Sequence, residues 1–198
     1  MRTVDITGNL RKEMEKVLDK HRLDHTIGVA YTAASLAFVH GADKDMALTA
    51  GMLHDCAKNI PNDEKLELCK KYGIELNKSE LANPSLIHAK LGEYLAKSKY
   101  GVDDEDILNA IRYHTTGRPA MSLLEKIIYV ADYIEPNRKP LPELDEIRKE
   151  AYRDLDLCVL HILSSILDYL NSSGAELDPM TNETFLYYDK LIKERGIL

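Results

Sequence analysis

Long apolar runs and paired cysteines are both missing from this 198-residue sequence. Charged residues interrupt every apolar stretch well short of the roughly 18 residues that a membrane span needs, and the first ten residues lack the apolar core of a secretion signal. Cys56, Cys69 and Cys158 are widely spaced and form no Cys-x-x-Cys motif. We therefore expect a protein without disulfides, working in the reducing cytoplasm.

Positive charge is also scarce, since 26 Lys and Arg face 33 Asp and Glu and leave a net charge of −7. This excess of negative charge disfavours a nonspecific surface for nucleic acid or anionic membranes, so we expect neither as a partner. A small anionic substrate is still compatible, because a bound metal and a few cations can reverse the field inside one cleft. Hydrophobic residues make up 44% and charged residues 30%, as in an ordinary globular domain.

Strand-like alternation is absent, whereas apolar residues recur at helical spacing along nearly the whole chain. Asp43 and Asp103 are predicted N-caps, and Ser122 with Glu125 forms a capping box. The predicted helices cover residues 10–18, 22–40, 43–55, 63–73, 84–96, 103–114, 122–135, 143–153, 155–170 and 181–195. The sequence thus predicts an all-α fold in a single domain, 1–198, with a metal core at about 10–138, a linker at 136–142 and C-terminal helices at about 143–198.

The adjacent His54 and Asp55 end an apolar run and are candidate metal ligands. Neighbours on a helix point about 100° apart, so both reach one ion only from a helix end or a distorted turn. Further candidates lie on or at the ends of other predicted helices: His25, His88, His114 and Asp132. Imidazole with carboxylate suits iron, manganese or zinc better than calcium.

Each candidate also has a plain structural interpretation. A histidine at a helix end, such as His114, can simply interact with the helix dipole. Asp132 shares an otherwise apolar stripe with Leu124 and Ile128, where a carboxylate needs either a charged partner or a metal. The remaining histidines have no such context, and we assign them to the surface or to ordinary packing: His21, His40 and His161.

Five motifs carry a family resemblance. They are Arg22-Leu23-Asp24-His25-Thr26, Leu53-His54-Asp55-Cys56-Ala57-Lys58, Ile87-His88-Ala89, Tyr113-His114-Thr115-Thr116-Gly117 and the stretch from Tyr129 to Arg138 that contains Asp132. Together they resemble the HD-domain metal phosphohydrolases and, within them, the YqeK subfamily. Its members are similar to bacterial hydrolases that split diadenosine tetraphosphate (Ap4A) symmetrically into two ADP. The resemblance spans about residues 22–138.

This resemblance implies an all-α HD-domain helical bundle with a helical C-terminal cap. It also implies a divalent or trivalent metal, with iron expected and manganese or zinc as alternatives, held by His25, His54, Asp55 and Asp132. A bound metal lowers the pKa of water to about 7 in favourable cases. The implied reaction is attack of that activated water on a phosphorus, with ADP as the leaving group.

Further roles follow from the same resemblance. Asp55, Lys58 and His88 are the candidate catalytic residues. The candidate substrate-binding residues are Arg22, Asp55, Lys58, His88, His114, Thr115, Asn137 and Arg138. His88 and His114 have a second interpretation, as ligands of a second metal. Arg112 and Arg118 are assigned to the surface.

Three other functions remain open at this point. The first is another HD-domain chemistry, such as that of a nucleotidase, a nucleoside triphosphate hydrolase or a cyclic-nucleotide phosphodiesterase. The second is a non-catalytic nucleotide-binding regulatory module, which the presence of all four ligand candidates and Lys58 disfavours. The third is a dinuclear iron oxygenase, which the cations suited to phosphate disfavour. The expected partner is a small nucleotide, and a homodimer is compatible with the sequence.

Overall fold

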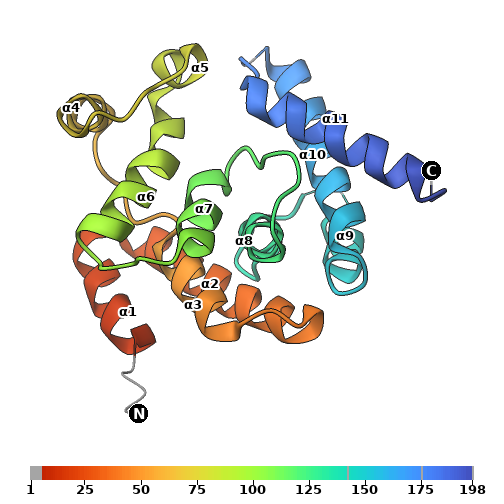
Figure 1. Ribbon diagram of the computed structural model, residues 1–198, viewed down its shortest axis with the longest axis horizontal. Coiled ribbons are helices and arrows are strands. Elements are labelled where there is room, and N and C mark those ends of the chain that lie inside the picture. Colours follow the sequence, from red (N-terminus) through yellow and green to blue (C-terminus); the bar gives the residue numbers. More distant parts are fainter. Residues whose placement is uncertain (1–5, 142, 175, 198) are drawn as a thin grey trace.

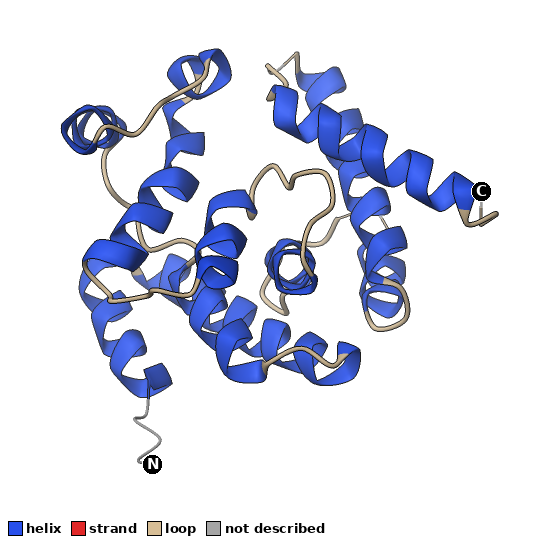
Figure 2. Ribbon diagram, viewed as in Figure 1, coloured by secondary structure: helices blue, strands red, loops and turns tan. Residues whose placement is uncertain are grey.

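A computed structural model describes residues 6–141, 143–174 and 176–197, with side chains from residue 9 onward. Within these ranges the secondary structure is entirely helical, and helices are joined by short loops (Figure 2). The elements are α1 (Ile6–Val17), α2 (Lys20–His40), α3 (Lys44–Leu53), α4 (Asn62–Tyr72), α5 (Lys78–Ala82), the 3-10 helix η1 (Pro84–Ile87), α6 (His88–Ser98), α7 (Glu105–Tyr113), α8 (Leu123–Ile134), α9 (Leu144–Ala151), α10 (Leu155–Ser173) and α11 (Pro179–Glu194). The all-α prediction is confirmed.

Local capping chemistry sets most helix boundaries. The Asp43 side chain accepts hydrogen bonds from the first turn of α3, and Ser122 and Glu125 form the expected capping box at the start of α8. Gly41 ends α2 in the left-handed conformation, with φ of 75°, a region that glycine enters without steric cost. These signals are contained in the sequence, so the corresponding elements were predictable.

Two N-terminal boundary predictions were wrong, and one helix was missed. The N-cap of α7 is Asp104 rather than Asp103, because the Asp104 carboxylate is the one that accepts from the first-turn N–H groups. Pro84 does not open an α-helix but the short η1, and α6 begins only at His88. Helix α5 was missed, although Asn77 and Glu80 form a capping box for it. The predicted linker 136–142 is non-helical through residue 141, and residue 142 lies outside the described residues.

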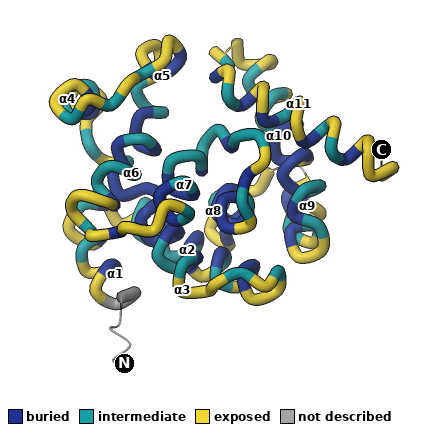
Figure 3. Tube along the Cα trace, viewed as in Figure 1, coloured by how far each residue is buried: buried dark blue, intermediate teal, exposed yellow. Residues whose placement is uncertain are grey.

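Helix α8 occupies the middle of the bundle, where it is seen end-on in Figure 1. It packs against α2, α7 and α10, and it is buried on nearly all sides, as Figure 3 shows. The C-terminal helices α9 to α11 lie on the opposite side of α8 from α4 to α6 (Figure 1). Most buried apolar side chains between Leu10 and Ile192 form one cluster around these helices, and a smaller cluster joins Ala57, Cys69, Ile87 and Leu91 beside α4 and α6.

Small residues bring α2 and α3 close together. Ala30 and Ala33 of α2 and Ala47 and Ala50 of α3 are fully buried. A Cβ added at Gly51 would lie 2.7 Å from the Cα of Ala30, so the two backbones approach too closely for a side chain. This contact places the end of α3 beside the middle of α2.

All three cysteines are buried free thiols. Burial raises the pKa of Cys56 to about 12, so this thiol is protonated and unreactive at neutral pH. Among the described helices, none has both the length and the apolar character that crossing a bilayer requires.

Replacing Gly51 by Ala should destabilise the fold by about 1–3 kcal/mol, because the new methyl group forces α2 and α3 apart. The measurement is the free energy of unfolding in urea. Gly92→Ala is the matched control, since its Cβ would meet neighbours at ordinary distances of 3.4–3.6 Å. The control should fold at least as stably as the parent, because alanine favours a helix over glycine. Equal stability of the two variants would contradict the tight α2–α3 contact.

Candidate metal centre

Six side chains from five parts of the chain meet in the bundle interior. They come from the second turn of α2, the turn after α3, the start of α6, the end of α7 and the last turns of α8: His25, His54, Asp55, His88, His114 and Asp132. Three overlapping triplets of their ligand atoms each lie within 4.8 Å. The side chains are buried except that of Asp132, which is 25% exposed and opens the cluster to solvent. Chain segments far apart in sequence therefore form one nitrogen–oxygen donor set.

Three of the four histidines are oriented by backbone. In each, ring Nδ1 lies within hydrogen-bond distance of the carbonyl oxygen three residues earlier: His54 with Gly51 (2.7 Å), His88 with Ser85 (2.6 Å) and His114 with Ile111 (2.7 Å). A carbonyl can only accept, so Nδ1 carries the proton and Nε2 presents its lone pair. Since each ring sits at a helix boundary, the carbonyl that it uses is near the helix end.

His25 is oriented differently because it lies inside α2. Its Nδ1 is 3.1 Å from Oε1 of the buried Glu135, which follows α8. The donated proton again fixes the tautomer that leaves Nε2 as an acceptor. All four imidazoles thus direct Nε2 toward the same region.

The Asp55 carboxylate lies between two groups of imidazoles. Its Oδ2 is 3.4 Å from Nε2 of His54 and 3.8 Å from Nε2 of His25. Its Oδ1 is 3.1 Å from Nε2 of His88 and 3.7 Å from Nε2 of His114. The position of His54 and Asp55 in the turn after α3, where regular helix has ended, lets both side chains reach the centre.

Asp132 completes the His25 and His54 side of the cluster. Its Oδ1 is 3.0 Å from Nε2 of His25 and 3.9 Å from Nε2 of His54. Among the described residues, Nε2 of His25, Nε2 of His54 and Oδ1 of Asp55 are buried without a hydrogen-bond partner. Unpaired buried acceptors are rare in folded proteins, and a cation would satisfy all three. The donor set therefore fits a divalent metal ion.

The charges of the cluster favour the ligating forms. Burial raises the pKa of Asp55, but the surrounding imidazoles outweigh it and hold this pKa well below its usual range. The pKa of Asp132 is lowered as well, because the nearby imidazoles of His25, His54 and His114 overcome the effect of burial. Both carboxylates are ionised at neutral pH. Burial lowers the pKa of His88 to about 4, so this ring is neutral there.

The HD domain family model matches residues 22–137, which contain all six side chains. The chain belongs to the HD-domain family. The symmetrical bis(5'-nucleosyl)-tetraphosphatase of Bacillus subtilis is 43% identical over 90% of this chain and 94% of its own, and that of Halalkalibacterium halodurans is 39% identical over 90% and 92%. A crystal structure from Clostridium acetobutylicum, of an HD superfamily hydrolase described as involved in NAD metabolism, is 41% identical, with a TM-score of 0.89 over 93% of this chain and 97% of that one.

Two cations contact the HD-domain cluster directly. Arg22 lies one turn before His25 on α2 and places Nη1 2.8 Å from Oδ2 of Asp55. Lys58 places Nζ 3.3 Å from Nε2 of His88, on the opposite side of Asp55. Burial lowers the pKa of Lys58, while the negative charge of Asp55 acts against this. Positive charge therefore lies on both sides of the shared carboxylate.

A cavity of about 510 Å³ adjoins the HD-domain cluster on the Arg22 side. Its lining includes His25, Asn137 and Arg138, all predicted site residues, and also Lys139, which sequence reasoning missed. The exposed His21, assigned to the surface, lines it too. Thr115 lines a different cavity, of about 130 Å³, near α5 and the start of α11.

The arginines and histidines that the sequence analysis assigned to the surface or to ordinary packing have partners outside the cluster. Arg112 pairs with Glu93 at 2.7 Å, and Arg118 binds the buried Glu125 through two hydrogen bonds. His40 contacts the carbonyl of Ala151, and His161 pairs with Glu150. Glu135 was missed as a site residue, although it lies within the Tyr129–Arg138 motif and directly precedes the helix-breaking Pro136.

Replacing Asp132 by Ala should weaken metal binding to the HD domain by about 100-fold or more, because it removes one carboxylate of the donor set. Metal content after dialysis, measured by elemental analysis, tests this. Asp145→Ala is the control, since that side chain is 87% exposed and outside the cluster. Retention of metal by the Asp132 variant would exclude this carboxylate as a ligand.

Proposed function

We propose that this HD domain is a symmetrical bis(5'-nucleosyl)-tetraphosphatase, which hydrolyses Ap4A at its central phosphoanhydride to give two ADP. The observation that carries the proposal is the nearly full-length similarity to enzymes with this activity at 34–43% identity, including that of Staphylococcus aureus, together with the convergence of six buried histidine and aspartate side chains. A phosphohydrolase must activate a water molecule and neutralise the charge of the phosphate. A metal held by the cluster would serve both purposes.

His25, His54, Asp55 and Asp132 are the proposed metal ligands, and iron is the proposed metal. The support is that their Nε2 and carboxylate oxygens face one another at 3.0–3.9 Å with the ring tautomers already fixed. A metal in this site supplies a water of lowered pKa and polarises a phosphoryl oxygen. The mixed imidazole and carboxylate set also accommodates manganese or zinc.

Arg22, Lys58 and Arg138 are proposed to neutralise the tetraphosphate. Arg22 and Arg138 line the 510 Å³ cavity, while Lys58 lies beyond Asp55 next to His88. A substrate with an ADP group on each side of the cleaved bond needs positive charge on both sides of the reacting phosphorus, and this distribution provides it. Asn137 lines the same cavity, and Thr115 follows His114 directly, so both remain proposed phosphate contacts.

One nucleoside is proposed to lie beyond Arg138. Arg138 and Leu141 also line a second cavity, of about 780 Å³, whose walls include Tyr133, Ile166 and Tyr169. The Arg138 guanidinium lies 5.6 Å from the centre of the Tyr133 ring. Aromatic and apolar walls suit an adenine base, while the arginine at the boundary faces the phosphates.

His88 and His114 are proposed to line the phosphate site rather than to hold a second metal. Their Nε2 atoms are 3.1 Å apart, and the neutral His88 accepts from the Lys58 ammonium. Lys58 thus supplies a positive charge where a second ion would lie, and two imidazoles with one shared carboxylate oxygen would give that ion few protein ligands. Asp55, Lys58 and His88 are the proposed catalytic group that faces the attacked phosphate and the departing ADP.

Purified protein should convert Ap4A into ADP as the sole nucleotide product, because the proposed cations flank the central phosphoanhydride. Ion-exchange chromatography of the products identifies the nucleotides formed, with Asp132→Ala as the inactive control. In ¹⁸O-labelled water, one of the two ADP products should carry one label from the attacking water. AMP with ATP would reject symmetrical cleavage, and hydrolysis of mononucleotides or cyclic nucleotides alone would favour another HD-domain chemistry. Nucleotide binding without turnover would indicate a regulatory module.

Lys58→Met should lower kcat about 100-fold, because a positive charge facing the departing phosphate is lost, while metal content stays at one ion per chain. Steady-state kinetics and elemental analysis provide the two measurements. Lys44→Met is the control, since Lys44 is 70% exposed and, among the described residues, pairs with its neighbour Asp45 alone. Two ions per chain in the unaltered protein would contradict the mononuclear proposal, and oxygen consumption would indicate an oxygenase.

A further inference from the structure

Glu135 is a buried carboxylate to which the proposed chemistry assigns no role. Only 1% of its surface is exposed, and both oxygens have partners. Oε1 is 3.1 Å from Nδ1 of His25, and Oε2 accepts the backbone N–H of Asn137 at 2.6 Å. One side chain therefore connects a proposed metal ligand on α2 with the loop after α8.

The backbone at Glu135 is held from the C-terminal side of the bundle. Arg148 of α9 donates from Nε to the carbonyl of Ile134 at 3.0 Å and from Nη2 to the carbonyl of Glu135 at 3.1 Å. The Ile134 carbonyl belongs to the last turn of α8, which Pro136 prevents from continuing, and the Glu135 carbonyl also accepts the backbone N–H of Arg138 at 3.0 Å. The carboxylate thus extends from a fixed point toward α2.

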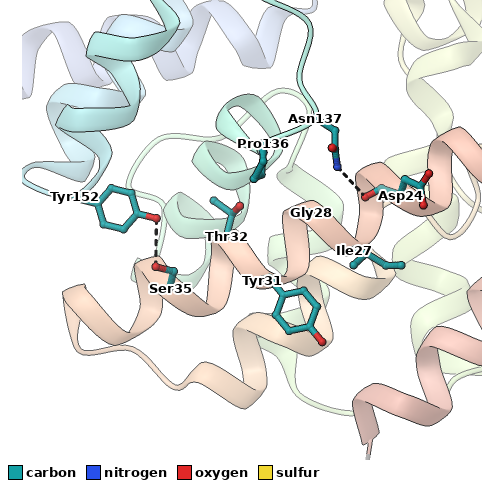
Figure 4. A pocket seen from close by; sticks show the side chains of 9 residues that line it. All are labelled: Asp24, Ile27, Gly28, Tyr31, Thr32, Ser35, Pro136, Asn137 and Tyr152. Carbon is teal, nitrogen blue, oxygen red and sulfur yellow. Dashed lines mark hydrogen bonds between the residues drawn. The ribbon is translucent and has the colours of Figure 1, made fainter.

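Gly28 provides the space that this carboxylate occupies. A Cβ at Gly28 would lie 2.5 Å from Oε2 of Glu135 and 3.4 Å from Nδ2 of Asn137. Figure 4 shows Gly28 on the face of α2 toward which Pro136 and Asn137 extend, with the Asn137 amide directed at the carbonyl of Asp24. Glycine inside a helix lowers its stability relative to alanine, and Gly28 has no positive φ that would require it. Close approach of Glu135 is the physical reason for glycine here.

His25 needs such a partner more than the other histidines do. His54, His88 and His114 donate Nδ1–H to a backbone carbonyl at a helix boundary. The carbonyls around His25 lie in the first two turns of α2, where helical hydrogen bonds use them. A side chain from another element must therefore set its tautomer and ring orientation.

We propose that Glu135 is the positioning residue of His25, holding Nδ1–H so that Nε2 points at the cation, and that Gly28 exists to admit it. The same carboxylate ties the loop that carries Arg138 to this ligand. The proposal rests on metal ligation by His25 within the proposed function. A carboxylate behind a metal-bound imidazole both orients the ring and raises its basicity.

The test is titration of the metal-free full-length protein with Co²⁺, followed by its visible absorption. The Glu135→Gln amide has one acceptor oxygen and one donor nitrogen, but both neighbours, the His25 Nδ1–H and the Asn137 backbone N–H, are donors. One of the two contacts therefore fails in either orientation of the amide. Gly28→Ala leaves Glu135 chemically intact but displaces its carboxylate. Each variant should bind Co²⁺ about 10–100-fold more weakly, with an altered absorption spectrum. The double variant should lose no more Co²⁺ affinity than the more strongly affected single variant, because both changes break the same contact between Glu135 and His25.

Glu125→Gln is the matched control for loss of a buried carboxylate. Glu125 is equally buried and accepts hydrogen bonds from Arg118 and the Ser122 N–H, away from the cluster. The Glu125→Gln variant should bind Co²⁺ with the affinity and absorption spectrum of the parent protein. Circular dichroism of each metal-free variant checks folding, and Gly28→Ala should keep at least the helical content of the parent.

Unchanged Co²⁺ affinity and spectrum in both Glu135→Gln and Gly28→Ala would overturn the positioning role and leave the metal centre intact. Equal weakening in Glu125→Gln would also overturn it, because the effect would then be a general consequence of losing a buried carboxylate. A parent protein that binds no Co²⁺ would overturn metal ligation together with this inference. None of these readouts uses Ap4A, so weakened binding in the two variants supports the role of Glu135 even if the proposed reaction fails.

Discussion

Hydrogen bonds from ring Nδ1 atoms are the interaction on which this site depends. Each of the four buried imidazoles donates on one side to a fixed oxygen and presents a lone pair on the other. Without these bonds the rings would be free to change tautomer or rotate, and Nε2 would not face the centre. The bundle thus prepares a donor set before any cation arrives, and this reduces the reorganisation that binding requires.

Helix ends supply most of the carbonyl oxygens that orient these rings. An α-helix leaves its last carbonyls without internal partners, and His54 and His114 use carbonyls at such ends. Because α3 stops at Leu53, Asp55 falls in a turn and can face imidazoles on two sides. The close contact of Gly51 with Ala30 then brings this turn to His25. Backbone geometry, small residues and ligand placement are therefore parts of one arrangement.

Charge is balanced within the site even though the chain carries a net charge of −7. Two ionised carboxylates face imidazole nitrogens, while Arg22 and Lys58 flank Asp55 from opposite sides. Such an arrangement attracts both a cation and a polyphosphate, since each meets charge of the opposite sign. A site for an anionic nucleotide is thus compatible with an acidic protein.

The sequence by itself determined the all-α class, most helix boundaries and the identity of the six clustered side chains. Capping and helical periodicity are local, so Asp43, Gly41 and the Ser122–Glu125 pair could be identified from neighbouring residues alone. The motif resemblance added the family, which the comparisons confirmed. The short α5 was missed despite the Asn77–Glu80 capping box, and the η1 turn before His88 was missed because Pro84 is equally compatible with the start of an α-helix.

Only the tertiary structure decided which atoms face one another. The position of Asp55 between two imidazole groups, the proximity of Lys58 to His88 and the contact of Glu135 with His25 all join segments that are far apart or separated by a turn. These distances follow from how closely whole helices pack, which depends on many small side chains at once. No local pattern records them, because helical periodicity fixes the face on which a residue lies but not what that face meets.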